Sequence, residues 1–157
     1  MKKITPCIWF DNQGEDAMNY YISIFKNSKI LSETRNGDAG PGPKGSLLAA
    51  SFDLDGTEIY LLNGGPHYTL SPAFSLFVKC VDQEEVDYYW DKLGTGGIFM
   101  QCGWLTDKYG VSWQVVPNIL QELLQDKDPK KSGRVMQAMM KMIKLDIQQL
   151  KDAASAS

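Results

Sequence analysis

The chain repeats one arrangement, a β-like segment followed by an amphipathic helix, at two places far apart in the sequence. The first copy runs from residues 4–10 into residues 12–21, and the second runs from residues 74–80 into residues 82–90. Further β-like runs bounded by glycine follow each helix. Neither half is long enough to bury a good hydrophobic core alone. The duplication therefore predicts two related modules that share one sheet system and trap a pocket between them.

Composition argues against two kinds of partner. The 16 basic and 19 acidic residues give a net charge of −3, so the clustered Lys and Arg that bind nucleic acid are missing. No apolar run approaches the roughly 20 residues that span a bilayer. The basic start at residues 1–3 meets Pro6, Trp9 and Asp11 rather than an apolar leader segment. A cytoplasmic location is expected, with neither nucleic acid nor membrane as a partner.

Cysteine usage fits the same compartment. Cys7, Cys80 and Cys102 cannot all pair within one chain, and Cys7 and Cys80 fall inside predicted strands, where a reduced cysteine acts as a small hydrophobe. No CxxC motif or Cys/His cluster is present, which argues against a structural zinc site. Reduced thiols are typical of the cytoplasm.

In the first half, apolar residues at helical spacing and two acidic residues in the first turn predict a capped helix that starts near residue 12. A strand over 29–34 and a Gly/Pro-rich loop over 36–45 come next. The runs 47–54 and 57–63, joined by Asp55-Gly56, predict a β-hairpin.

In the second half, a strand over 74–80 and a helix over 84–93 precede two short strands, 100–106 and 111–116. The remainder predicts helices over 118–125 and 132–151, whose methionines are interpreted as packing. The chain is thus expected to be α+β and to form a single domain over 1–157. Its modules cover 3–65 and 72–117, and its C-terminal helices cover 118–152.

Three motifs resemble the PhnB-like family, also labelled 3-demethylubiquinone 3-methyltransferase-like, of the vicinal-oxygen-chelate superfamily that includes glyoxalases and bleomycin-resistance proteins. The motifs are Thr5-Pro6-x-x-Trp9-Phe10-Asp11, Asn63-Gly64-Gly65-Pro66-His67, and the run over residues 101–117. The resemblance extends over about residues 3–150. It implies two βαβββ modules whose mixed sheets curl into open half-barrels, usually completed in a homodimer.

The resemblance also implies positions for a divalent metal. Matching the superfamily pattern places them at Thr5, Tyr60, Ser75 and Gln114. None of these is a usual ligand of a first-row metal, which prefers imidazole and carboxylate groups. A methyl donor usually sits on a Gly-rich loop after the first strand, and only Gly14 lies there. We therefore expect neither a metal nor a cofactor.

Strand alternation separates pocket residues from core residues, because residues i and i+2 share a face. One face carries Thr5, Cys7 and Trp9 and is expected to meet Tyr60, Ser75 and Gln114 in a common space. The opposite face should pack under the helices, with Ile8 and Phe10 joined by Phe74, Leu76 and Trp113. The expected ligand pocket is lined by Thr5, Cys7, Trp9, Tyr60, Ser75, Phe77, Cys102, Trp104 and Gln114, with His67 as a further candidate.

Aromatic walls with a few hydrogen-bonding groups suit a small, partly planar organic ligand. The leading interpretation is a non-metal small-molecule-binding protein with a cavity between the half-barrels. One alternative is an enzyme of the same superfamily, either metal-assisted (lyase or isomerase type), a methyltransferase, or acting through Cys102 or His67. In the second alternative the aromatic side chains fill the half-barrels and the chain is a structural dimer module.

Open half-barrels leave strand edges and apolar faces to cover, so we expect a homodimer. Light scattering at micromolar concentration should give about twice the mass of the 17.6 kDa protomer. A mass of one protomer would contradict this expectation.

Overall fold

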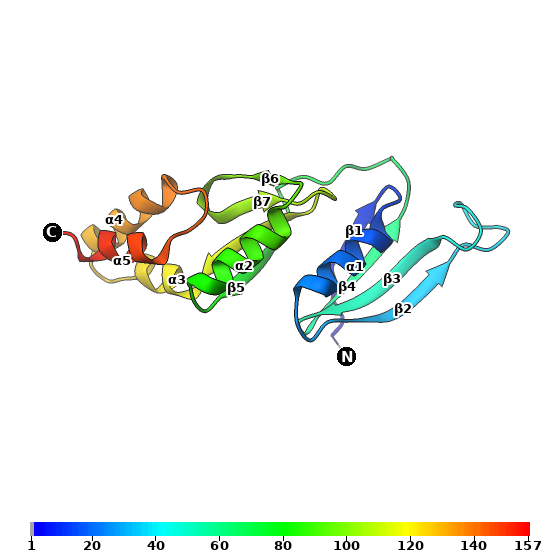
Figure 1. The fold of residues 1–157 in the computed structure, drawn as a ribbon, viewed down its shortest axis with the longest axis horizontal. Coiled ribbons are helices and arrows are strands. Elements are labelled where there is room, and N and C mark those ends of the chain that lie inside the picture. The colour runs from blue at the N-terminus through cyan, green and yellow to red at the C-terminus, as the bar shows by residue number, and fades with distance from the viewer. Residues whose placement is uncertain (1) are drawn as a thin grey trace. The chain divides into compact units, whose positions relative to one another are not determined.

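The computed structural model describes residues 2–157 as two compact units, one ending at Leu70 and the other running from Ser71 to Ser157 (Figure 1). The first unit contains, in order, β1 (Cys7–Phe10), α1 (Gly14–Ile24), β2 (Lys29–Arg35), β3 (Leu47–Leu54) and β4 (Thr57–Asn63). Its sheet has the strand order β1-β4-β3-β2. Strand β1 runs parallel to β4, and the other pairs are antiparallel.

The second unit repeats this plan and adds three helices. Its elements are β5 (Leu76–Cys80), α2 (Gln83–Gly94), β6 (Ile98–Phe99), the 3₁₀ turn η1 (Gln101–Gly103), β7 (Trp104–Thr106), β8 (Ser112–Pro117), α3 (Asn118–Leu124), α4 (Pro129–Met140) and α5 (Ile147–Ser155). The sheet order β5-β8-β7-β6 matches that of the first unit, again with one parallel pair, β5 with β8. The predicted α+β class with two βαβββ modules and open mixed sheets is confirmed. The expectation of one shared sheet system is wrong, because the described strands of each module form a sheet of their own.

The β3–β4 hairpin forms where its turn sequence predicts it. Asp55 and Gly56 both have positive φ, 49° and 88°, as the type I′ turn requires. The backbone N–H of Gly56 also donates to Asp53 Oδ1 at 2.6 Å. The turn fixes the register, in which Leu54 pairs with Thr57.

Helix α1 starts two residues later than predicted, and no side chain of its own caps it. Its cap comes from the end of β4, which pairs with the end of β1, because Asn63 Oδ1 accepts the backbone N–H of Gly14 at 2.8 Å. The same amide donates to the carbonyl of Leu47 at 3.0 Å. A Cβ on Gly14 would lie 2.6 Å from Asn63 Oδ1, so this contact needs glycine. Helix α2 is capped locally instead, since Asp82 accepts from Glu85 N.

Two strands begin later in the structure than the sequence predicts. Strand β1 starts at Cys7 rather than residue 4, and Ile4, inside the predicted strand, is 90% exposed. Pro6 has no N–H to donate and takes part in the sheet only through its carbonyl, which accepts from Tyr60 N. Strand β5 starts at Leu76, and the prediction that Phe74 packs under the helices is wrong because its side chain is exposed.

Strand β6 was not predicted. It precedes the expected strand over 100–106, of which only β7 forms, because η1 takes the place of its first half. Phe99 stacks on Trp90 of α2 with ring centroids 4.9 Å apart, and it packs so closely on Gly94 that a Cβ there would clash. The chain then turns through η1 before β7 begins. The contact of Phe99 with Trp90 joins two different elements, so no alternating pattern of residues around Ile98 predicts this strand.

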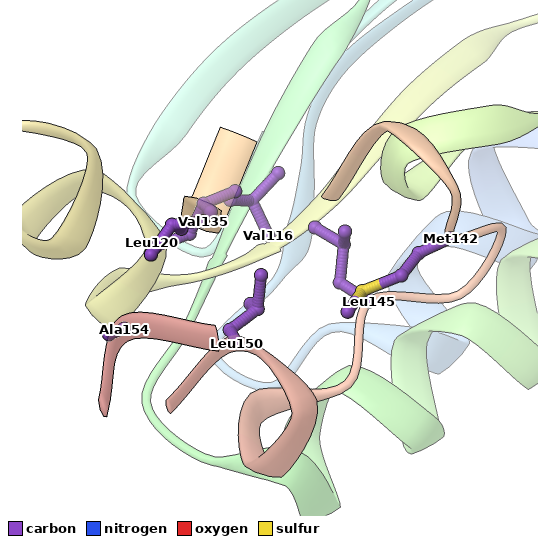
Figure 2. Packing of buried hydrophobic residues seen from close by; sticks show 7 residues of the cluster. All are labelled: Val116, Leu120, Val135, Met142, Leu145, Leu150 and Ala154. Carbon is purple, nitrogen blue, oxygen red and sulfur yellow. The ribbon is translucent and has the colours of Figure 1, made fainter. Parts of the chain in front are cut away.

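The predicted single helix over 132–151 is two helices. Between α4 and α5 the carbonyls of Met142 and Ile143 accept the backbone N–H groups of Cys102 and Gly103, at 2.9 and 2.8 Å. These bonds hold the connection between α4 and α5 against η1, so the residues of this connection do not continue α4 as a helix. The apolar cluster that joins these helices to β8 comprises Val116, Leu120, Val135, Met142, Leu145, Leu150 and Ala154 (Figure 2).

Burial follows the predicted alternation in β1 and at Trp113, although Ser112 and Val116, on the same face of β8 as Gln114, are also buried. Ile8 and Phe10 are buried while Cys7 is exposed, and Trp113 is buried while its neighbour Gln114 is only half-buried. The indole N–H of Trp113 donates to the buried carboxylate of Asp107 at 2.8 Å. Among residues 2–157, no helix has the length and apolar character to cross a bilayer.

Replacement of Trp113 by alanine should lower the free energy of unfolding by about 3–5 kcal/mol, because it empties a large core volume. The matched control is Phe74→Ala, which truncates an aromatic side chain that is 64% exposed. It should change stability by no more than about 0.5 kcal/mol. Urea unfolding midpoints compare the two. Equal midpoints would contradict the burial assigned to Trp113.

Candidate functional site

The second unit contains a groove on the face of its sheet that α2 leaves uncovered. Its volume is about 470 Å³. We call it the β8 groove, and its lining residues are Phe77, Cys102, Trp104, Gln114, Val116, Leu120, Gln121, Leu124, Gln125 and Met139.

Three of these side chains form a row across the sheet. Gln114 of β8 pairs with Phe77 of β5 on one side and with Trp104 of β7 on the other. Side chains at paired positions point to the same face, so the amide lies between two aromatic rings. Phe77 is 52% exposed, so its ring is accessible to a ligand in the groove. The row provides apolar contact area with one central polar group.

The orientation of Gln114 is fixed by Ser75, which precedes β5. Gln114 Nε2 donates to Ser75 Oγ at 3.0 Å. No protein group within residues 2–157 donates to the carbonyl oxygen, Gln114 Oε1. This oxygen is therefore an open acceptor in a groove with mostly apolar walls, where a ligand N–H or O–H gains most from a hydrogen bond.

Cys102 lies in the groove wall with a left-handed backbone, φ 60° and ψ 34°. Its N–H bond to the α4–α5 connection requires that turn, and its Sγ donates to the carbonyl of Met139 at 3.6 Å. A thiolate nucleophile needs an adjacent base. None of the ten residues described as lining the groove is His, Lys or Arg. The described lining of the groove offers apolar contact and hydrogen bonding to a ligand.

The other predicted pocket residues lie in the first unit. Cys7 and Tyr60 are paired in the parallel β1–β4 ladder, and Tyr60 is 44% exposed. Trp9 donates through its indole N–H to the carbonyl of Gly65 at 2.9 Å and meets the ring of Tyr68 edge-on. Thr5 is half-buried just before β1. The convergence of this set with Ser75 and Gln114 stays a prediction.

His67 is exposed and lines a separate hollow of about 670 Å³ in the first unit. The loop over 36–46 forms part of its wall. Buried Asn36 holds this loop, since its amide donates to Ser46 Oγ at 2.9 Å and accepts from Gly42 N. Two sequence signals coincide with this hollow, the Gly/Pro-rich loop and the motif Asn63-Gly64-Gly65-Pro66-His67, whose five residues all line it.

The donor set expected at a metal site of this superfamily does not fit a divalent ion. Ser75 and Gln114 are hydrogen-bonded to each other, and Thr5 and Tyr60 offer neutral hydroxyl groups. Across residues 2–157 no group of three or more His, Cys, Asp or Glu side chains is arranged to hold a metal. A borderline divalent cation prefers imidazole, carboxylate or thiolate ligands. We derive no chemistry through a metal here.

Six of the ten residues described as lining the groove were not predicted from the sequence, namely Val116 of β8 and five residues of the C-terminal helices. Leu120, Gln121, Leu124 and Gln125 come from α3 and its C-terminal cap, and Met139 comes from α4. A signal was present, because α3 begins at Asn118 directly after β8 ends at Pro117. A helix that follows a strand without a loop must place its first turns beside the end of that strand. Met139, interpreted as packing, also contacts the apolar cluster of the C-terminal helices.

The fold and its paired modules define a protein of the vicinal-oxygen-chelate class. The chain belongs to the 3-demethylubiquinone-9 3-methyltransferase (PhnB-like) family, whose model matches residues 2–116. This match ends well before residue 150, to which the motifs had extended the resemblance. A search of curated proteins gives no match.

Solved structures agree with this assignment. A PhnB protein from Bacillus cereus, which bears the same methyltransferase name, is 38% identical with a TM-score of 0.69; the match covers 74% of this chain and 99% of that one. A Pseudomonas aeruginosa protein is 18% identical with a TM-score of 0.63, over 74% and 98% of the two chains. A fosfomycin resistance protein, FosX, from Listeria monocytogenes is 13% identical with a TM-score of 0.56, over 80% and 98%. The last two show the fold alone.

The three thiols differ in their environments. Burial, helped by the nearby charge of Glu85, raises the pKa of the Cys80 thiol to about 12. Burial also raises the pKa of Cys7, although that residue is exposed at the start of β1. Cys102 is half-buried and lines the β8 groove.

N-ethylmaleimide at pH 8.5 should therefore modify Cys7 and Cys102 of the native protein and leave Cys80 intact. Because the Cys80 pKa of about 12 exceeds the pH, its thiol stays protonated as well as buried. Peptide mass spectrometry with and without urea measures this, and Cys80 should react only in urea. Modification of native Cys80 as fast as Cys7 would contradict its assigned burial.

Proposed function

We propose that the chain is a PhnB-like protein that binds a small, partly planar organic molecule without a metal, in the β8 groove. The observation that carries the proposal is the row Phe77–Gln114–Trp104, with Ser75 holding the central amide. Aromatic surface flanking one oriented acceptor is the usual composition of a site for such a ligand. The groove volume of about 470 Å³ falls within the range of small-molecule sites.

Methyl transfer, the activity in the family name, finds no support in the first strand–helix turn. A donor with an anionic or polar group would need the backbone N–H groups at the start of α1. The N–H of Gly14 is already bound by Asn63, and the glycine has no space for further atoms on that side. Catalysis through Cys102 lacks a basic partner in the groove wall. Binding is therefore favoured over either reaction.

Self-association is proposed alongside binding. Strand β2 is the outer strand of its sheet, and all seven of its residues are exposed, including Ile30 and Leu31. An uncovered edge of this length is a template for pairing with another chain. In the homodimer expected from the sequence, a second copy of the same chain would be this partner.

Ligand protection of Cys102 tests the binding proposal. We expect 1-naphthamide, a planar aromatic amide, to slow modification of Cys102 by N-ethylmaleimide in a saturable manner. Unchanged reactivity of Cys102 at saturating probe, or slowing that does not saturate, would overturn the proposal. Slowing at Cys7 as well would support the predicted convergence of Cys7 with the groove.

Gln114→Ala should weaken 1-naphthamide binding about fivefold, the effect of losing one hydrogen bond worth about 1 kcal/mol. Because Gln114 is half-buried and lines a groove, the urea midpoint of the variant should stay close to that of the parent protein. Fluorescence titration and urea unfolding measure the two effects. A much lower urea midpoint together with unchanged affinity for 1-naphthamide would contradict the role assigned to this amide.

A further inference from the structure

The C-terminal extension, residues 118–155, lies outside the family match. That match ends at residue 116, within β8, and the Bacillus cereus structure accounts for 74% of this chain although 99% of its own length is matched. The extension forms α3, α4 and α5. The family resemblance therefore gives no role to these helices.

The extension is fixed to the second module at several points. Gln83 of α2 donates through Nε2 to the carbonyl of Leu145 at 3.1 Å and accepts the N–H of Ile147 at 2.8 Å. Lys144 forms an ion pair with Asp87 at 3.0 Å. Buried Val116 at the end of β8 joins the apolar cluster of the three helices (Figure 2). The helices therefore form a fixed wall rather than a loose tail.

Half of the β8 groove comes from this extension, five of its ten lining residues. Leu120 and Leu124 are four residues apart and form one stripe along α3, and Gln121 and Gln125 form the adjacent stripe. Met139 of α4 adds a further apolar contact. The wall thus places apolar side chains and two amides opposite the row Phe77–Gln114–Trp104.

The groove also lacks charge. Its ten described lining residues include no Asp, Glu, Lys, Arg or His, and their side-chain polar groups are three amides, one thiol and the indole N–H of Trp104. An ionised ligand would lose hydration there without gaining a counter-charge. A neutral ligand with an apolar ring and amide, carbonyl or hydroxyl groups would lose little and could bond to Gln114.

We propose that the C-terminal extension determines specificity, and that α3 makes the β8 groove selective for uncharged aromatic ligands with hydrogen-bonding groups. This inference rests on the proposed binding function. Leu120, Leu124 and Met139 exclude water from the ring of the ligand, and the amides of Gln121 and Gln125 form hydrogen bonds with its polar groups. The chemistry of the ligand is thus set by residues that the family match does not include.

Two probes of the same shape test this selectivity, neutral 1-naphthamide and anionic 1-naphthoate. The parent protein should bind the amide at least about tenfold more tightly, the discrimination expected when a site meets a charge without a partner. Gln121→Lys adds one positive charge to the wall and should shift the ratio of the two affinities toward the naphthoate by about fivefold, as a partly exposed ion pair allows. Fluorescence titration measures both affinities.

Glu122→Gln is the matched control, because it changes the net charge by the same amount at the next position of α3, which does not line the groove. It should leave the affinity ratio unchanged. Leu124→Ala should weaken binding of the amide roughly tenfold by removing apolar contact. Circular dichroism confirms that each variant keeps its helices.

The outcomes separate this inference from the proposed function. If the parent protein binds 1-naphthamide and protects Cys102, but Gln121→Lys and Leu124→Ala behave like Glu122→Gln, the groove binds ligand and the extension does not select it. That result overturns the inference alone. Absence of binding and of Cys102 protection in the parent protein overturns both.

Discussion

The parallel pairing of the first strand of each module with its last strand is the constraint on which the rest of the structure depends. β1 pairs with β4 and β5 pairs with β8, and a helix makes the crossover in each case. The crossover helix covers one face of its sheet, so the other face has no partner within the module. Apolar residues such as Ile8 and Trp113 occupy the covered face. The side chains that can meet a ligand are left on the second face.

The register of β8 then decides which side chains face the groove, and Asp107 helps to fix it. Its buried carboxylate accepts the N–H groups of Tyr109 and Val111 in the β7–β8 turn and the indole N–H of Trp113. A slip of one residue would break all three bonds and turn Gln114 into the core. A buried carboxylate that lost these donors would be costly. The position of Gln114 between two aromatic rings therefore follows from a turn several residues away.

Local chemistry made much of this fold predictable from sequence. The Asp55-Gly56 turn, the cap at Asp82 and the alternation around Trp113 each depend on neighbours in the chain. The failures depend on distant contacts. Asn63 caps a helix 49 residues away, and β6 forms because Phe99 stacks on Trp90. The same distinction applies to the groove. The alternation of strand residues predicts that Phe77 and Gln114 line it, whereas the position of the helical wall depends on how the C-terminal helices pack on the sheet.

The turn at Cys102 and Gly103 is where the family's half-barrel meets the C-terminal extension. Both residues have positive φ, 60° and 81°, a conformation that costs a non-glycine residue about 1–2 kcal/mol. Their two backbone bonds to the α4–α5 connection offset this cost. A Cβ at Gly103 would lie 2.8 Å from both Leu145 and the carbonyl of Val115, so glycine is required there. The same turn places the Cys102 side chain in the groove wall. The unusual backbone of Cys102 is thus explained by how the wall is attached to the sheet, and no reaction at sulfur is needed to account for it.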